Sequence, residues 1–155
     1  MYKKIVVPLD GSPLAECVLP HVEALARGCL VNEIIFVRAV EPFQYPTYAG
    51  EVTITPAEVE RINAGNKLEA EDYLRKLTDR FKFENIPTGW EVLLGRAAER
   101  IADYGSKNQA DLVVIATHGR SGLSRWVWGS VADRILRSAC VPVLMVRAPG
   151  CFPGV

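Results

Sequence analysis

The chain has 155 residues, the length of one domain with a sizeable hydrophobic core. Lysine plus arginine and aspartate plus glutamate number 18 each, so no overall charge favours nucleic acid or an anionic membrane surface. The longest apolar runs are only strand-length, and strand-like residues begin near the first residue. We therefore expect no membrane span and no signal peptide, and hence a cytoplasmic protein.

The cysteines and histidines do not suggest a metal site. The cysteines form neither a CxxC pair nor the spacing of zinc ligands, and the chain has only 2 histidines. The four cysteines are Cys17, Cys29, Cys140 and Cys151. We expect these thiols to be reduced and mostly buried.

The first strand and helix are marked by clear boundaries. A strand is predicted at residues 5–9, where an apolar run stops at Asp10. Ser12 is a suitable helix cap, and apolar residues then recur at helical spacing up to Gly28. Pro20 falls inside this helix and lacks an amide donor, so we expect a kink or a helix boundary there.

The second strand is predicted at residues 34–40. It is followed by an irregular segment, rich in Tyr, Pro and Gly, that reaches Thr53 and could form a lid. Thr55 and Glu58 have the spacing of a capping box, so a long helix is predicted from there to Phe81.

Two further strand–helix units follow. A third strand is predicted at residues 90–94, followed by a helix whose apolar face includes residues 98–102. The apolar, β-branched run at residues 112–115 is typical of a central parallel strand covered on both faces. A further helix begins at Ser130.

The last strand is predicted from Val141 to Arg147. Pro142 cannot donate to a sheet ladder, so this is an edge strand or Pro142 lies at its start. The alternation of strands and helices predicts a five-stranded, doubly wound parallel α/β sheet with helices on both faces. We expect one domain at residues 1–148 and a short tail at residues 149–155.

The residues after the first and fourth strands suggest a nucleotide site, because ligands of such sheets bind where the strand order reverses. Gly119 and Gly129 would let backbone amides approach phosphates, and a helix start adds donors. A carboxylate would repel phosphate, so Asp10 is better placed to accept hydrogen bonds from a ribose. The backbone at Ala39, where the second strand ends, could read an adenine edge.

Each of these residues also has a purely structural interpretation. Asp10 could form an Asx turn, and Gly119 and Gly129 could serve only as a turn and a helix cap. Arg120 could neutralise phosphate or simply be solvated. His118 has no identifiable orienting carboxylate, so we assign no catalytic residue.

Three motifs resemble the universal stress protein family over essentially the whole chain: KKIVVPLDGS, VRAVEP and THGRSGLSRWVWGSVADRILRSACVPVLMVR. Nucleotide-binding members have a glycine, two residues, a glycine, nine residues, then glycine with serine or threonine. Gly119, Gly129 and Ser130 satisfy the second part. Ala116 stands where the first glycine would be, so we expect a slightly altered backbone approach to the ribose.

The resemblance implies an adenine nucleotide alpha hydrolase-like fold and a homodimeric stress-response module. It implies ATP as ligand, with ADP or AMP as alternatives, Mg²⁺ bound through the phosphates in some members, and at most slow hydrolysis. Asp10 and the residue-116 backbone would hold ribose, Ala39 adenine, and Gly119, Gly129 and Ser130 phosphates. The expected nucleotide contacts are Pro8, Leu9, Asp10, Ser12, Ala39, Ala116, His118, Gly119, Arg120, Gly129, Ser130 and Val131.

Other functions remain open at this point. A small adenine-nucleotide hydrolase of the same architecture would carry SGGxDS or HIGH motifs, and the chain has neither. A receiver domain needs an acidic pair after its first strand, whereas Asp10 has no acidic neighbour. A ligand-free interaction dimer is the third alternative. Pairing of the last strand, Val141 to Arg147, across a two-fold axis would cover its apolar edge and give the homodimer.

Overall fold

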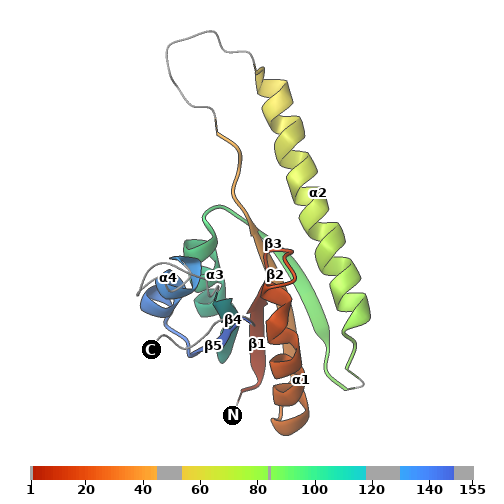
Figure 1. The fold of residues 1–155 in the computed structure, drawn as a ribbon, viewed down its shortest axis with the longest axis vertical. Helices are drawn as coiled ribbons and strands as arrows, with labels where there is room; N and C mark the ends of the chain where they lie inside the picture. Colours follow the sequence, from red (N-terminus) through yellow and green to blue (C-terminus); the bar gives the residue numbers. More distant parts are fainter. Residues whose placement is uncertain (1, 45–53, 84, 118–129, 149–155) are drawn as a thin grey trace.

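The computed structural model describes residues 2–44, 54–83, 85–117 and 130–148, which form alternating strands and helices (Figure 1). The strands are β1 (Lys4–Pro8), β2 (Glu33–Val40), β3 (Thr88–Leu94), β4 (Leu112–Thr117) and β5 (Val143–Arg147). The α-helices are α1 (Leu19–Gly28), α2 (Pro56–Arg80), α3 (Ala97–Lys107) and α4 (Ser130–Ser138), and a short 3-10 helix (Ala15–Val18) precedes α1.

The five strands form one parallel sheet in the order β3-β2-β1-β4-β5. The chain first builds outward from β1 to β3, and then crosses to the other side of β1 to add β4 and β5. The strand order therefore reverses between β1 and β4, which is where ligands of doubly wound sheets bind. β5 lies at an edge of the sheet, as the proline near its start predicted.

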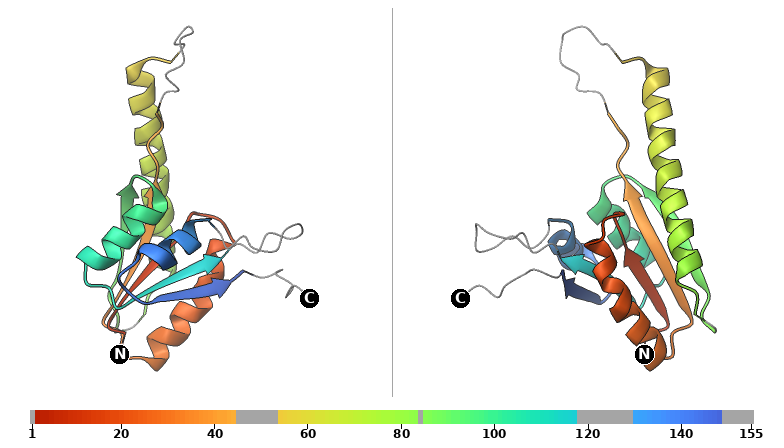
Figure 2. Two further views of the ribbon diagram at one scale, coloured as in Figure 1. Left: turned by 90° about the vertical axis from the view of Figure 1, so that its left-hand side faces the viewer. Right: turned by 45° about the vertical axis from the view of Figure 1, so that its right-hand side comes forward.

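Helices cover both faces of the sheet (Figure 2). On one face α1 and α2 contribute Val22 and Leu74, which are fully buried. On the opposite face α3 and α4 contribute Ile101 and Ile135 to a second core. The predicted doubly wound α/β architecture is thus confirmed.

β1 is buried on both faces. Ile5 and Val7 belong to the core under α1 and α2, whereas Val6 belongs to the core under α3 and α4, and all three are 0% exposed. A central strand with a helix layer on each side needs apolar residues at its buried positions, which explains the apolar run that follows Lys4.

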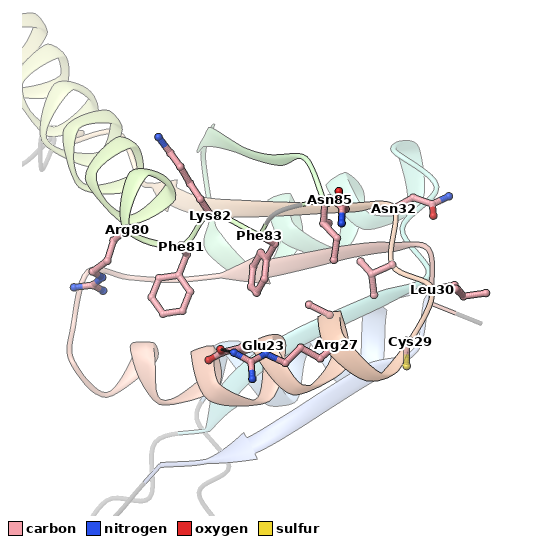
Figure 3. A pocket seen from close by; sticks show the side chains of 13 residues that line it. Glu23, Arg27, Cys29, Leu30, Asn32, Arg80, Phe81, Lys82, Phe83 and Asn85 are labelled. Atoms are coloured by element: carbon pink, nitrogen blue, oxygen red, sulfur yellow. Dashed lines mark hydrogen bonds and ion pairs between the residues drawn. The ribbon is translucent and has the colours of Figure 1, made fainter.

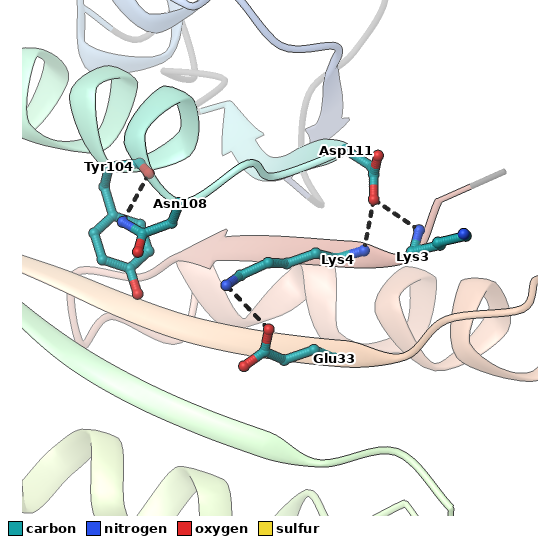
Figure 4. A network of polar contacts seen from close by, with 6 residues as sticks. All are labelled: Lys3, Lys4, Glu33, Tyr104, Asn108 and Asp111. Atoms are coloured by element: carbon teal, nitrogen blue, oxygen red, sulfur yellow. Dashed lines mark hydrogen bonds and ion pairs between the residues drawn. The ribbon is translucent and has the colours of Figure 1, made fainter.

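A polar network fixes the amino end of β1 (Figure 4). The Asp111 carboxylate accepts hydrogen bonds from the backbone N–H groups of Lys3 and Lys4, at 3.0 and 2.9 Å. The Lys4 ammonium lies 3.0 Å from Glu33 at the start of β2. These contacts hold the starts of β1, β2 and β4 in register.

Pro20 and Pro142 lie at or just before the start of an element of secondary structure. Pro20 does not kink a continuous helix: α1 begins at Leu19, so Pro20 lies in its first turn, where a missing amide donor is tolerated. Pro142 lies just before β5, which begins at Val143 and not at the predicted Val141. The Pro142 carbonyl still accepts a hydrogen bond from Val113 N–H at 2.9 Å, so proline joins the sheet as an acceptor only.

The predicted capping box of α2 is confirmed. Glu58 N–H donates to Thr55 Oγ1 at 3.3 Å, and Thr55 N–H donates to Glu58 Oε2 at 2.7 Å. The hydrogen bonds from Thr55 lower the pKa of Glu58. The buried residues of α2 all lie in its second half, and its first half extends beyond the sheet (Figure 1). None of the helices in the described ranges is long and apolar enough to span a membrane.

The cysteines are less buried than the sequence predicted. Cys17 and Cys29 are only partly buried and Cys140 is exposed, while Cys151 lies outside the described residues. Burial nevertheless raises the pKa of the Cys17 thiol. Within the described ranges no group of three His, Cys, Asp or Glu side chains is placed to hold a metal ion.

Two leucines of α2 provide a test of this packing. Leu74 is fully buried, whereas Leu68 is 64% exposed on the same helix. We expect Leu74→Ala to lower the free energy of unfolding by about 2–5 kcal/mol, since it leaves a cavity between α2 and the sheet. Leu68→Ala should change it by less than about 0.5 kcal/mol. Urea unfolding followed by circular dichroism measures both, and equal effects would contradict the described placement of α2.

Candidate functional site

The carboxyl ends of β1 and β4 lie side by side. Ile5 pairs with Leu112 and Val6 with Val113. Continuing this register brings Leu9 level with Ala116, next to the end of β4. The sequence expectation that the first and fourth strands end at one place is therefore met by the strands themselves. His118, Gly119, Arg120 and Gly129, which would complete the site, lie outside the described residues.

The chain turns sharply after β1. The Asp10 carboxylate accepts a hydrogen bond from Ser12 N–H at 2.8 Å, and Ser12 Oγ accepts one from Ala15 N–H at 3.1 Å. Gly11 between them has φ +89°, a left-handed conformation that favours glycine. Asp10 thus forms the Asx turn that the sequence left as an alternative. A carboxylate has about four acceptor positions, so a ligand hydroxyl can share it with the turn.

The backbone of Ala39 faces the end of β1. In a parallel strand the N–H and C=O groups of successive residues point alternately to the two neighbouring strands. Val37 C=O accepts from Leu9 N–H of the β1 side, and Val40 C=O accepts from Gly95 N–H of the β3 side, both at 2.9 Å. Ala39 therefore directs its backbone groups toward β1, beyond the last ladder pair of β1 and β2.

The backbone of Ala116 faces the same place from the other side. Thr117 C=O accepts from Ala148 N–H on the β5 side at 3.2 Å, so the groups of Ala116 point toward β1. The Ala116 side chain is 8% exposed and belongs to the core under α1 and α2. Its methyl group, present where the family signature has glycine, is thus accommodated in the core.

The remaining predicted contacts surround this point. Pro8 and Leu9 are buried at the end of β1. α4 begins at Ser130 as predicted, and Val131 in its first turn is 39% exposed. Because α4 is the helix between the parallel strands β4 and β5, its amino end lies on the carboxyl side of the sheet, where orphan N–H groups attract anions.

Sequence reasoning missed a group of polar side chains beside the Asp10 turn. The Arg38 guanidinium lies over the Tyr73 ring, 5.5 Å from its centre, and 3.2 Å from Glu69 Oε1. The Tyr73 hydroxyl donates to Glu16 at 3.1 Å. Burial, followed by the nearby Glu16 carboxylate, raises the Tyr73 pKa, and the charge of Asp10 raises it further. Arg38 directly precedes Ala39, but nothing in its sequence context indicates these contacts.

A groove of about 700 Å³ lies elsewhere in the molecule (Figure 3). Its walls come from the second half of α1 and from the connections that lead into β2 and β3, including Arg27, Leu30, Phe81 and Phe83. These segments lie at the amino ends of the strands. The groove is therefore distinct from the edge where β1 and β4 end.

Residues 1–147 match the universal stress protein family. The chain belongs to that family. Universal stress protein MJ0531 of Methanocaldococcus jannaschii is 34% identical over 152 residues, which cover 96% of this chain and 84% of that protein.

Solved structures agree with this assignment. The structure of MJ0577 from the same organism has a TM-score of 0.68 at 25% identity and covers 97% of this universal stress protein and 99% of that chain. A universal stress protein in complex with cAMP has a TM-score of 0.61 at 18% identity, with 95% and 98% covered. A family member from Arabidopsis thaliana with AMP bound has a TM-score of 0.60 at 13% identity, with 96% and 93% covered. At these identities the last two structures show a shared fold.

The strained turn at Gly11 gives a second test. A Cβ at Gly11 would lie 3.1 Å from Arg38 Nη1, and its φ is unfavourable for alanine. Gly11→Ala should therefore destabilise the protein by about 1–2 kcal/mol. Gly65, which lies within α2, is the control, because a Cβ built there has no described atom within 4 Å. Gly65→Ala should leave stability unchanged or raise it by about 1 kcal/mol. Thermal unfolding distinguishes the two, and a neutral Gly11→Ala would contradict the described turn.

Proposed function

We propose that this universal stress protein binds ATP, or alternatively ADP or AMP, at the carboxyl ends of β1 and β4. The observation that carries the proposal is the convergence of two strand backbones on the Asp10 turn. Ala39 and Ala116 both direct their N–H and C=O groups toward the end of β1. Backbone groups read an adenine or ribose edge without needing particular side chains, and Asp10 is an acceptor for ribose hydroxyls.

The proposed roles follow the order of groups in the ligand. Ala39 binds adenine, Asp10 and the Ala116 backbone bind ribose, and the amino end of α4 binds phosphate. Family structures that hold AMP and cAMP support an adenosine monophosphate moiety as the common ligand. The further contacts proposed from the sequence are Pro8, Leu9, Ser12, His118, Gly119, Arg120, Gly129, Ser130 and Val131.

The phosphate end of the ligand distinguishes ATP from AMP. Gly119, Gly129 and Ser130 are proposed to bind the phosphates through backbone amides at a helix start. Mg²⁺ is proposed to bind through those phosphates, as the resemblance to nucleotide-binding family members implies. We assign no catalytic base, so the proposed activity is binding with at most slow hydrolysis, acting as a regulatory module in stress responses.

Replacement of Asp10 tests both binding and the role of this carboxylate. Asp10→Asn retains an acceptor for Ser12 N–H but removes the charge, so the turn survives while the ribose hydrogen bonds weaken. We expect roughly a tenfold rise in Kd for ATP, measured by titration calorimetry, because hydrogen bonds to a charged acceptor are the stronger ones.

Asp103→Asn is the matched control, because Asp103 is an exposed carboxylate on α3 that pairs with Lys107. Its Kd should equal that of the wild type. Titrations with ATP, ADP and AMP, each with and without Mg²⁺, identify the preferred ligand. Absence of heat with all three nucleotides would refute the proposed function. Wild-type affinity in Asp10→Asn would show that the Asp10 charge acts only in the turn and not in nucleotide binding.

The homodimer is proposed to form through β5. This strand is at an edge of the sheet, and Leu144, its second residue, is 38% exposed. An unpaired apolar edge strand is commonly covered by a symmetric partner. We expect light scattering at micromolar concentration to give the mass of a dimer, and Leu144→Lys to shift it toward the monomer. Leu30→Lys, at an 83% exposed leucine in the connection between α1 and β2, should remain dimeric. A monomeric wild type would exclude this interface.

A further inference from the structure

Arg38 connects the turn after β1 to helix α2. A Cβ on Gly11 would lie 3.1 Å from Arg38 Nη1 and 3.3 Å from its Cζ, so the guanidinium rests directly against this glycine. The same group lies over Tyr73 of α2 at 5.5 Å and pairs with Glu69 at 3.2 Å. A single side chain of β2 therefore contacts both the Asp10 turn and α2.

The burial of these groups shows which contact holds the guanidinium. The Arg38 side chain is 19% exposed, whereas that of Glu69 is 71% exposed. An ion pair to so exposed a carboxylate is screened and contributes little. Packing between the Gly11 backbone and the Tyr73 ring therefore dominates, with the guanidinium over the ring at 5.5 Å from its centre.

The Tyr73 ring is itself held in place. Its hydroxyl donates to Glu16 Oε1 at 3.1 Å, and Arg80 Nη2 lies 2.6 Å from the other oxygen of the same carboxylate. Glu16 belongs to the 3-10 helix that follows the Asp10 turn. Two residues therefore connect the region of the turn to α2: Arg38, which packs against Gly11 and Tyr73, and Glu16, which accepts a hydrogen bond from Tyr73.

We propose that Arg38 is a positioning residue for adenine nucleotide binding, acting on the Asp10–Ser12 turn and not on the nucleotide itself. The inference rests on the proposed function, in which Asp10 binds ribose. Glycine at position 11 gives the turn many accessible conformations, and the guanidinium packed against it restricts them. Without that support, the turn has to be ordered when the nucleotide binds, and affinity falls.

The test compares Arg38 variants by nucleotide affinity and by amide exchange. Arg38→Met keeps a long side chain but removes the planar cation, and we expect roughly a tenfold rise in Kd for the nucleotide that the wild type binds best. In the nucleotide-free protein, the Gly11 and Ser12 amides should exchange faster with deuterium. Arg38→Lys keeps the charge but lacks the broad guanidinium that lies against Gly11 and over the Tyr73 ring, so it should resemble Arg38→Met and not the wild type.

Arg27→Met is the control, since Arg27 is a 76% exposed arginine of α1 that pairs with Glu23. Its Kd and its Gly11 and Ser12 exchange should match the wild type. A lower melting temperature of the Arg38 variants with unchanged Kd and unchanged exchange would overturn the proposal, because it would show only a structural role. Tyr73→Leu, which removes the ring next to the guanidinium but not Arg38, should also raise Kd, and wild-type affinity in this variant would equally overturn the proposal.

Failure of the proposed function is distinguishable from failure of this inference. The first is seen in the wild type alone, when neither ATP, ADP nor AMP gives heat. The second requires a wild type that binds and Arg38 variants that bind equally well.

Discussion

The position of β1 at the centre of the sheet determines the rest of the structure. β1 is flanked by β2 and β4 and covered by helices on both faces, so its buried residues after Lys4, from Ile5 to Pro8, have to be apolar. Polar chemistry can begin only where the strand ends. There the two flanking strands are themselves parallel to β1, and the backbone groups of Ala39 and Ala116 point toward it. Burial of one strand thus produces both the stability of the fold and the position of the candidate site.

Much of this arrangement could be predicted from the sequence, because it depends on local patterns. Apolar runs located all five strands, and the pairing of Thr55 with Glu58 located the start of α2. Boundaries that depend on tertiary contacts were missed. β4 extends past the predicted Ile115 to Thr117, because Thr117 pairs with Arg147 of β5 and its carbonyl accepts from Ala148. No local sequence pattern predicts such pairing between strands.

The candidate site likewise contains positions that the sequence predicts and a position that it does not. Asp10 and Ala39 were predictable because each stands at the end of an apolar strand, and strand ends meet at one edge of a parallel sheet. Arg38 was not predictable: an arginine in a strand is usually solvated, and its contact with Tyr73 joins residues 35 positions apart. Alternation along β2 places Ala39 and Arg38 on opposite faces of the sheet, so the residue proposed to bind adenine and the residue that packs against Gly11 occupy neighbouring positions.

Ala116 illustrates why a backbone site tolerates substitution. The methyl group that departs from the family signature lies in the core under α1 and α2, while the N–H and C=O of the same residue point toward β1. A side chain directed into the core affects packing, and a backbone group directed at the ligand affects binding. The two are separate at this position because the strand geometry sends them in perpendicular directions. On the proposed binding, the alanine would therefore act through small shifts of β4, whose position is fixed by its pairing with β1 and β5.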